Sequence, residues 1–184
     1  MSNTNLQYDK AIDSCRDIYY KKLKDYGTSW RLLRIISITD QLYIKAQRIR
    51  TLQEKGVQQI EDGIYSEFKA MVNYGIIGLI QIELAAGAEL ELSEEQALQL
   101  YDRYADTARQ TMLKKNHDYG EAWRAMSQES FVDLILVKLM RIRQILANEG
   151  RTLVSEGIDS NFIDIINYSL FALILIDEGI HKGD

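Results

Sequence analysis

The chain has 184 residues, of which 46% are hydrophobic and 27% are charged, and its formal net charge is −5. This composition allows a substantial core but excludes the broad positive field that attracts nucleic acids or anionic membranes, so direct nucleic-acid binding is not expected. The single cysteine, Cys15, lies on the apolar stripe of a predicted helix and excludes disulfide scaffolds and cysteine-rich zinc sites. The N-terminus has no apolar signal region, and the longest apolar run, 169–176, is too short to span a bilayer. We therefore expect a cytoplasmic protein that does not bind membranes.

The chain contains no proline, where average usage would give roughly nine. Apolar residues recur at helical spacing, and no stretch of useful length has the alternation of a strand, which predicts an all-α protein. Its six main helices are expected at about residues 4–24, 39–54, 64–86, from Ser93 through Met112, 130–148 and 159–177. The tail after the sixth helix, GIHKGD, is expected to be frayed, with His181 solvated.

Two helix starts carry the pattern of a capping box, in which a hydroxyl and a glutamine three residues later each bond the other's backbone amide. Thr4 with Gln7 and Ser93 with Gln96 have this spacing. Gly27 is expected to end the first helix in a tight reversal that requires positive φ.

One stretch occurs twice, as KLKDYGTSWR at 22–31 and KNHDYGEAWR at 115–124, with a constant offset of 93. The offset also holds for Tyr8/Tyr101, Asp9/Asp102, Arg16/Arg109, Asp40/Asp133, Lys45/Lys138, Arg48/Arg141 and Arg50/Arg143. This tandem duplication predicts two three-helix repeats, residues 1–88 and 93–180, packed as one globular unit with an internal pseudo-twofold axis. Because one repeat would leave its apolar third helix half covered, we expect the third and sixth helices to pack on each other, or the chain to form a homodimer.

Cations occupy positions where the helical periodicity expects apolar residues. Lys45 and Lys138 lie on the inner stripes of the second and fifth helices, and Arg48 and Arg141 follow one turn later. A lysine on an inner stripe needs an anion or a route to solvent. In the sixth helix, the carboxylate of Asp164 interrupts an otherwise apolar run and needs a cation, a metal ion or water.

Two interpretations follow from these residues. In the first, Lys138 and Asp164 form a structural ion pair between the fifth and sixth helices. In the second, the cations, Asp164 and Asn167 converge with the DYG-W corner on a cavity that holds an anionic ligand.

The first repeat helps to weigh these interpretations. In the third and sixth helices the offset is 94, as Asn73/Asn167 and Tyr74/Tyr168 show, so Ala70 stands where Asp164 stands, yet Lys45 is kept. A lysine that served only to pair with this acid would have no reason to persist where the acid is absent. Its persistence favours the second interpretation, a cavity that holds an anionic ligand. Asp40 and Glu67 are alternative partners for Lys45.

The repeated corner supplies the same four residue types in each copy: Lys22, Asp25, Tyr26 and Trp30, and Lys115, Asp118, Tyr119 and Trp123. The aromatic residues are interpreted either as core anchors that fix the next helix or as a platform that stacks on a base or sugar. In the second case the lysine and the arginine at the end of each motif, Arg31 or Arg124, hold phosphate. The aspartates are candidate caps.

The pattern K-x-x-DYG-x-x-W, then K-x-x-RI, then an apolar helix with D-x-x-NY, resembles the nucleotide modification associated domain family, first type, in tandem-duplicated form. The resemblance implies a nucleotide or phosphate ligand and a place in nucleotide or base modification. The ligand-binding residues that it implies are Lys22, Asp25, Tyr26, Trp30, Lys45, Arg48, Asn73, Tyr74, Lys115, Asp118, Tyr119, Trp123, Lys138, Arg141, Asn167 and Tyr168.

The helical layout is also similar, at the level of the fold, to the all-α NTP pyrophosphatases of the MazG-like group. That similarity implies Mg²⁺ and a weak nucleotide pyrophosphohydrolase activity in the second repeat, with Glu156 and Asp164 as metal ligands. Single-copy relatives commonly carry a further acid four residues before the position of Asp164, and this residue is Ser160 here. Of the two metal-ligand positions, the first repeat has an acid only at the one that matches Glu156, which is Asp62. The alternative is a non-enzymatic helical interaction or scaffold protein, in which the same residues lock helices together.

Overall fold

The computed structural model describes residues 3–56, 63–153 and 156–184, and these residues form an all-α protein. The main helices are α1 (Thr4–Tyr26), α2 (Ile35–Lys55), α3 (Ile64–Leu84), α4 (Glu94–Tyr119), α5 (Gln128–Ala147) and α6 (Ile158–Asp177). Short 3₁₀ helices, η1 (Ser29–Leu32) and η2 (Ala122–Ala125), follow α1 and α4. The predicted fold class, six main helices in two copies of three, is confirmed.

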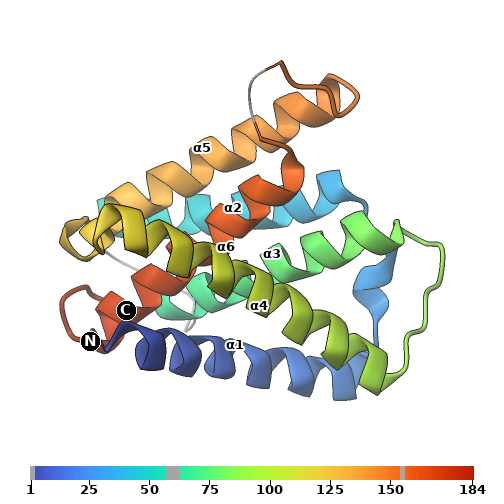
Figure 1. Ribbon diagram of the computed structural model, residues 1–184, viewed down its shortest axis with the longest axis horizontal. Coiled ribbons are helices and arrows are strands. Elements are labelled where there is room, and N and C mark those ends of the chain that lie inside the picture. Colours follow the sequence, from blue (N-terminus) through green and yellow to red (C-terminus); the bar gives the residue numbers. More distant parts are fainter. Residues whose placement is uncertain (1–2, 57–62, 154–155) are drawn as a thin grey trace.

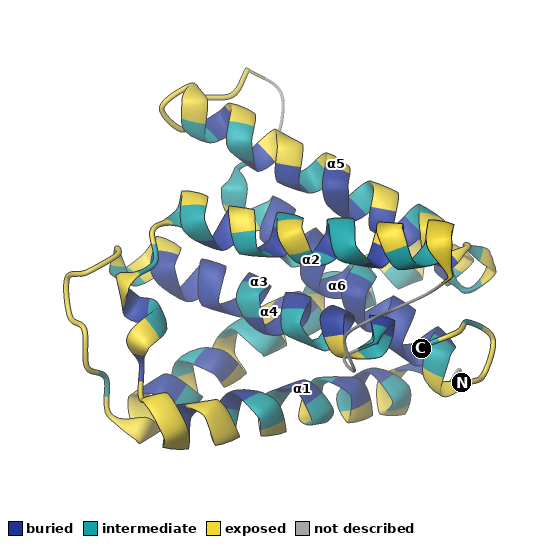
Figure 2. Cartoon of the chain, turned by 180° about the vertical axis from the view of Figure 1, so that it is seen from behind, coloured by how far each residue is buried: buried dark blue, intermediate teal, exposed yellow. Residues whose placement is uncertain are grey.

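The helices α3 and α6 pack on each other in the middle of the molecule, with α1 and α4 on one side and α2 and α5 on the other (Figure 1). Glycines allow this close approach, since a Cβ atom on Gly75 would lie 2.6 Å from the side chain of Ile166 and one on Gly78 would lie 2.9 Å from the ring of Phe162. Most of α3 and α6 is buried, whereas the outer helices alternate between buried and exposed stripes (Figure 2). The expected packing of the third helix on the sixth is confirmed within one chain.

The capping box of α4 is confirmed. Ser93 Oγ accepts a hydrogen bond from the Gln96 amide at 3.1 Å, and Gln96 Oε1 accepts one from the Ser93 amide at 3.0 Å. The predicted box at Thr4 is wrong, because α1 starts after Asn3 without a side-chain cap.

The side chains expected to cap α1 bond instead to the second repeat. Thr4 Oγ1 accepts from Arg124 Nη2 at 2.7 Å and also contacts Glu121, while Gln7 Oε1 accepts from Arg124 at 2.6 Å. Charged partners across the protein make stronger hydrogen bonds than a backbone amide would.

The C-terminal tail is ordered, so the expectation of fraying is wrong. The Gly183 carbonyl accepts from the Tyr65 amide at 3.0 Å, and the Lys182 carbonyl accepts from Gln128 Nε2 at 2.7 Å. His181 packs edge-on against Phe131, 6.4 Å between ring centroids, and is half-buried rather than solvated. Bonds to α3 and α5 fix a segment that has no helical pattern of its own.

Hydrogen bonds cross between the repeats as a matched pair. Tyr8 of α1 donates to Asn167 Oδ1 of α6 at 2.7 Å, and Tyr101 of α4 donates to Asn73 Oδ1 of α3, also at 2.7 Å. Both tyrosines are fully buried and both asparagines nearly so. Burial raises the pKa of each tyrosine hydroxyl well above its usual value, which keeps it a donor. Each repeat therefore supplies the partner of the other.

Ion pairs follow the same crossed rule on the outer helices. Two matched pairs of arginines each bond an aspartate of the other repeat: Arg16–Asp102 at 2.6 Å, Arg109–Asp9 at 2.7 Å, Arg50–Asp133 at 3.6 Å and Arg143–Asp40 at 2.9 Å. These pairs are partly exposed and each contributes little free energy, but their pattern defines the pseudo-twofold axis.

Cys15 is fully buried, and burial raises the pKa of its thiol to about 12. Its carbonyl accepts from Asn73 Nδ2 at 2.9 Å, and the matching carbonyl of Ala108 accepts from Asn167 Nδ2 at 3.1 Å. The thiol is therefore inert, as expected.

Within the described residues, α6 has the length and hydropathy of a helix that could cross a bilayer. Most of that stretch is buried against the other helices, as in the core helix of a folded domain.

The crossed tyrosine bonds predict a difference between two tyrosines on the same helix. Tyr101→Phe should lower the free energy of unfolding by about 1–3 kcal/mol, since it leaves a buried asparagine oxygen without its donor. Tyr104→Phe, which removes a surface bond to Glu83, should change it by less than about 0.5 kcal/mol. Urea denaturation measures both, and equal effects would contradict a structural role for the crossed bond.

Candidate functional site

Each repeat has a sharp corner after its first helix. Gly27 and Gly120 both have positive φ, at 63° and 61°, as the DYG reversal predicts. The preceding tyrosines point outward, with Tyr26 70% and Tyr119 74% exposed, so their interpretation as core anchors is wrong.

The tryptophans of the two corners differ in their surroundings. Trp123 is buried and stacks on Phe171 with ring centroids 4.2 Å apart and planes within 6°, so it is a core anchor. Trp30 is half-buried, with its ring 6.3 Å from that of Tyr19. The position that holds Phe171 in α6 is Ile77 in α3.

In the second repeat, a single carboxylate lies between two lysines. Asp164 Oδ2 is 2.7 Å from Lys138 Nζ, and Asp164 Oδ1 is 2.7 Å from Lys115 Nζ. The predicted Lys138–Asp164 pair is confirmed, and the motif lysine is a second partner that the sequence did not suggest. Burial lowers the pKa of Lys115, but the hydrogen bond and charge of Asp164 outweigh it, and the net shift is upward.

In the first repeat, the acid has moved by one helical turn. Glu67 accepts from Arg48 at 2.7 Å and lies 3.4 Å from Lys45 Nζ, so it is the substitute partner. Asp40, the other candidate, pairs with Arg143 on the surface. Lys22, the counterpart of Lys115, forms no ion pair with any residue that the structure describes.

A pocket of about 690 Å³ opens at the first corner, between α1, η1, α2 and α3. Six of the predicted ligand-binding residues line it: Lys22, Tyr26, Trp30, Lys45, Asn73 and Tyr74. Ala70 and Ile77 also line it, at the positions that Asp164 and Phe171 fill in the second repeat. The two corners thus have similar backbones and different contents.

Several predicted site residues are held elsewhere. Arg48 binds Glu67, Asn73 and Asn167 make the crossed hydrogen bonds, and Tyr168 packs toward Phe131 at 6.2 Å between centroids. Asp25 is exposed outside the pocket lining, and Asp118 is exposed beside His117 at 3.0 Å.

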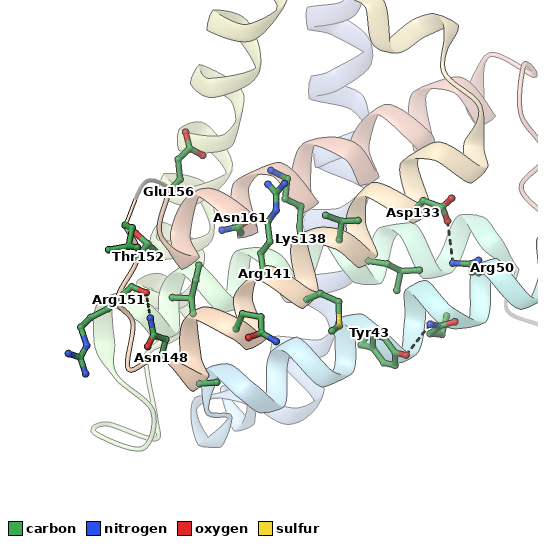
Figure 3. Close-up of a pocket in the computed structure, with 18 residues that line it drawn as sticks. Tyr43, Arg50, Asp133, Lys138, Arg141, Asn148, Arg151, Thr152, Glu156 and Asn161 are labelled. Carbon is green, nitrogen blue, oxygen red and sulfur yellow. Dashed lines mark hydrogen bonds and ion pairs between the residues drawn. The ribbon is translucent and has the colours of Figure 1, made fainter.

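A broader pocket of about 1280 Å³ lies along α2 and α5 near the start of α6 (Figure 3). Lys138 and Arg141 extend from α5 beside Asn161, while Glu156 lies farther out, near the loop that precedes α6 (Figure 3). Glu156 is exposed here, and Asp164 does not line this pocket.

The residues present do not make a convincing Mg²⁺ centre. Both oxygens of Asp164 are engaged by ammonium groups, which a metal ion would have to displace. Across residues 3–56, 63–153 and 156–184, no three acidic, histidine or cysteine side chains gather as a metal site. Asp62, the first-repeat counterpart of Glu156, lies outside the described residues.

The arginines of the two motifs have structural partners. Arg31 is fully buried and donates to the carbonyls of Glu89 at 2.7 Å and Ala85 at 2.9 Å, and it also bonds Gln81. It thereby ties the link between the repeats to the first corner. Its repeat partner, Arg124, lies among carboxylates and amides near the start of α1. Sequence reasoning assigned both arginines to phosphate and missed this use of Arg31.

The fold and this site define a duplicated all-α domain whose corners gather lysines and aromatic residues. The chain belongs to the family "Nucleotide modification associated domain 1", whose model matches residues 22–82 and 115–176. The two matches fit the tandem duplication and confirm the resemblance stated above. Neither a comparison with curated proteins nor one with solved structures returned a match. The fold-level similarity to all-α NTP pyrophosphatases stays a prediction.

The carboxylate between two lysines predicts a local loss of stability on its removal. Asp164→Asn should lower the free energy of unfolding by about 1–3 kcal/mol, below the usual cost of breaking a buried pair because Lys115 is half exposed. Asp133→Asn, on the surface of α5, should change it by less than about 0.5 kcal/mol. Chemical denaturation of both variants provides the measurement, and a neutral Asp164→Asn would show that the lysines do not depend on this carboxylate.

Proposed function

We propose that this protein binds a nucleotide or a similar phosphate-bearing ligand in the pocket of its first repeat, in keeping with its family. The observation that carries the proposal is the replacement of Asp164 by Ala70 at the matched position, while both lysines are kept. Lys22 and Lys45 line the pocket, and Ala70 lines it with them.

The charges of the pocket favour an anion. Lys22 has no acidic partner among the described residues, and Lys45 is held only loosely, 3.4 Å from Glu67. Glu67 is the acid that lines the pocket, and its other oxygen is 2.7 Å from Arg48. The ammonium of Lys45, whose side chain is 24% exposed, gains from an incoming phosphate oxygen, because charge-assisted hydrogen bonds are the strong ones. Lys22 is exposed and adds its charge to the pocket lining.

The aromatic side chains favour a ligand with a ring. Tyr26 and Trp30 line the pocket on the α1 and η1 side, and Tyr74 lies on α3 with its ring 5.8 Å from Lys45 Nζ. An exposed tyrosine and a half-buried tryptophan can stack on a base without displacing core packing. A volume of about 690 Å³ also lies in the range of small-molecule sites.

Binding, rather than hydrolysis, is the activity that we propose. The resemblance predicts a weak Mg²⁺-dependent pyrophosphohydrolase in the second repeat, where Asp164 is already bound by Lys115 and Lys138. Release of pyrophosphate from nucleoside triphosphates with Mg²⁺ tests that prediction directly, with Asp164→Asn as the variant that should abolish any turnover.

A binding experiment separates our proposal from the alternative of a non-enzymatic scaffold. Nucleoside mono-, di- and triphosphates, with and without Mg²⁺, should include at least one that raises the melting temperature and binds in calorimetry. Lys22→Ala should weaken that binding by about tenfold or more, the value of one charge-assisted hydrogen bond. Because Lys22 has no described ion pair, the variant should keep its baseline stability.

The matched control is Lys115→Ala, which removes the equivalent lysine of the second repeat and should leave ligand affinity unchanged. A scaffold protein would show no shift with any nucleotide, and Lys22→Ala would then resemble the unmodified protein in every measurement. That outcome would contradict the proposal that the first repeat binds a nucleotide.

A further inference from the structure

The two corners can be compared because the pseudo-twofold axis relates them. Lys22 and Lys115 occupy matched positions on α1 and α4, and Lys45 and Lys138 occupy matched positions on α2 and α5. In the second repeat both ammonium groups reach one carboxylate, at 2.7 Å each. In the first repeat the equivalent place is open, because Ala70 ends at its methyl group and lines the pocket.

We propose that the first repeat takes a nucleoside monophosphate without a metal ion, with its phosphate between Lys22 and Lys45 where Asp164 places its carboxylate in the second repeat. This rests on the proposed function and names its ligand class. In the second repeat the carboxylate of Asp164 is the anion between the lysines. In the first repeat Ala70 leaves that place open for the phosphate of a ligand.

The balance of charge supports a monophosphate. A phosphate monoester carries a charge of about −1.5 to −2 at neutral pH, which suits two lysines once Arg48 has taken up the charge of Glu67. A triphosphate brings more charge and normally Mg²⁺, which requires oxygen ligands from the protein or ordered water. Of the described residues that line the pocket, Glu67 is the acid available, and it is already bound to Arg48 and Lys45.

Of the two corners, the first is the one with room for the ring of the ligand. Ile77 lines that pocket, and Trp30 is half-buried. In the second repeat, Phe171 stands at the position of Ile77 and stacks on Trp123, so the matched space is filled by protein side chains. One nucleotide per chain is the expected stoichiometry.

Calorimetry of the full chain in EDTA, with adenosine, AMP, inorganic phosphate and ATP as ligands, tests the inference. The ATP titration is then repeated with Mg²⁺ in place of EDTA. AMP should bind at one site per chain and about tenfold or more tighter than adenosine. Other nucleoside monophosphates should follow, because stacking tolerates every base.

The matched variants are Ala70→Asp and Ala70→Asn, which add similar volume with and without charge. Ala70→Asp should fold, since its carboxylate meets Lys22 and Lys45, and should weaken AMP binding about tenfold more than Ala70→Asn does. Equal losses in the two variants would overturn the inference. Binding of ATP that is tighter than that of AMP and requires Mg²⁺ would also overturn the inference. If that binding still depends on Lys22, the proposed function stands, whereas no binding of any phosphate ligand would end both.

Discussion

The fold depends on a pair of buried hydrogen bonds that each join one repeat to the other. Tyr8 reaches Asn167 and Tyr101 reaches Asn73, and neither repeat contains both members of its own bond. A repeat alone would bury an asparagine without its donor or expose the apolar faces of α3 or α6, both of which are costly. The arrangement resembles an isologous dimer joined into one chain, in which each repeat completes the hydrogen bonds of the other.

This symmetric centre leaves the corners free to diverge. The matched residues that the duplication keeps most visibly, the tyrosines, aspartates and arginines of the outer helices, serve the contact between repeats. The lysines at the corners do not contribute to that contact, and their anionic partners differ between the copies, Glu67 in one and Asp164 in the other. Residues kept in both copies therefore fall into two groups: those that join the repeats, and the corner lysines, which do not.

Helical periodicity predicted the six helices, and the duplication predicted the packing of α3 on α6, because each repeat alone would leave an apolar third helix half covered. Helical periodicity also identified the lysine at position 138 as a partner of Asp164. It did not predict that Lys115 would reach the same carboxylate, nor that Thr4 would bond across the molecule rather than cap its helix. Those contacts depend on how distant helices meet, which spacing along one chain does not encode.

The movement of one acid by a single turn accounts for the difference between the corners. With the carboxylate at position 164, both lysines of the second repeat converge on it, and Phe171 with Trp123 fills the space beside them. With it at position 67, one turn earlier on the matched helix, Arg48 becomes the nearer partner. Lys22 is then left facing a pocket lined by Ala70. Because the helices themselves are held by the crossed bonds, the two corners differ without a change of fold, with an alanine in one copy where the other has an acid.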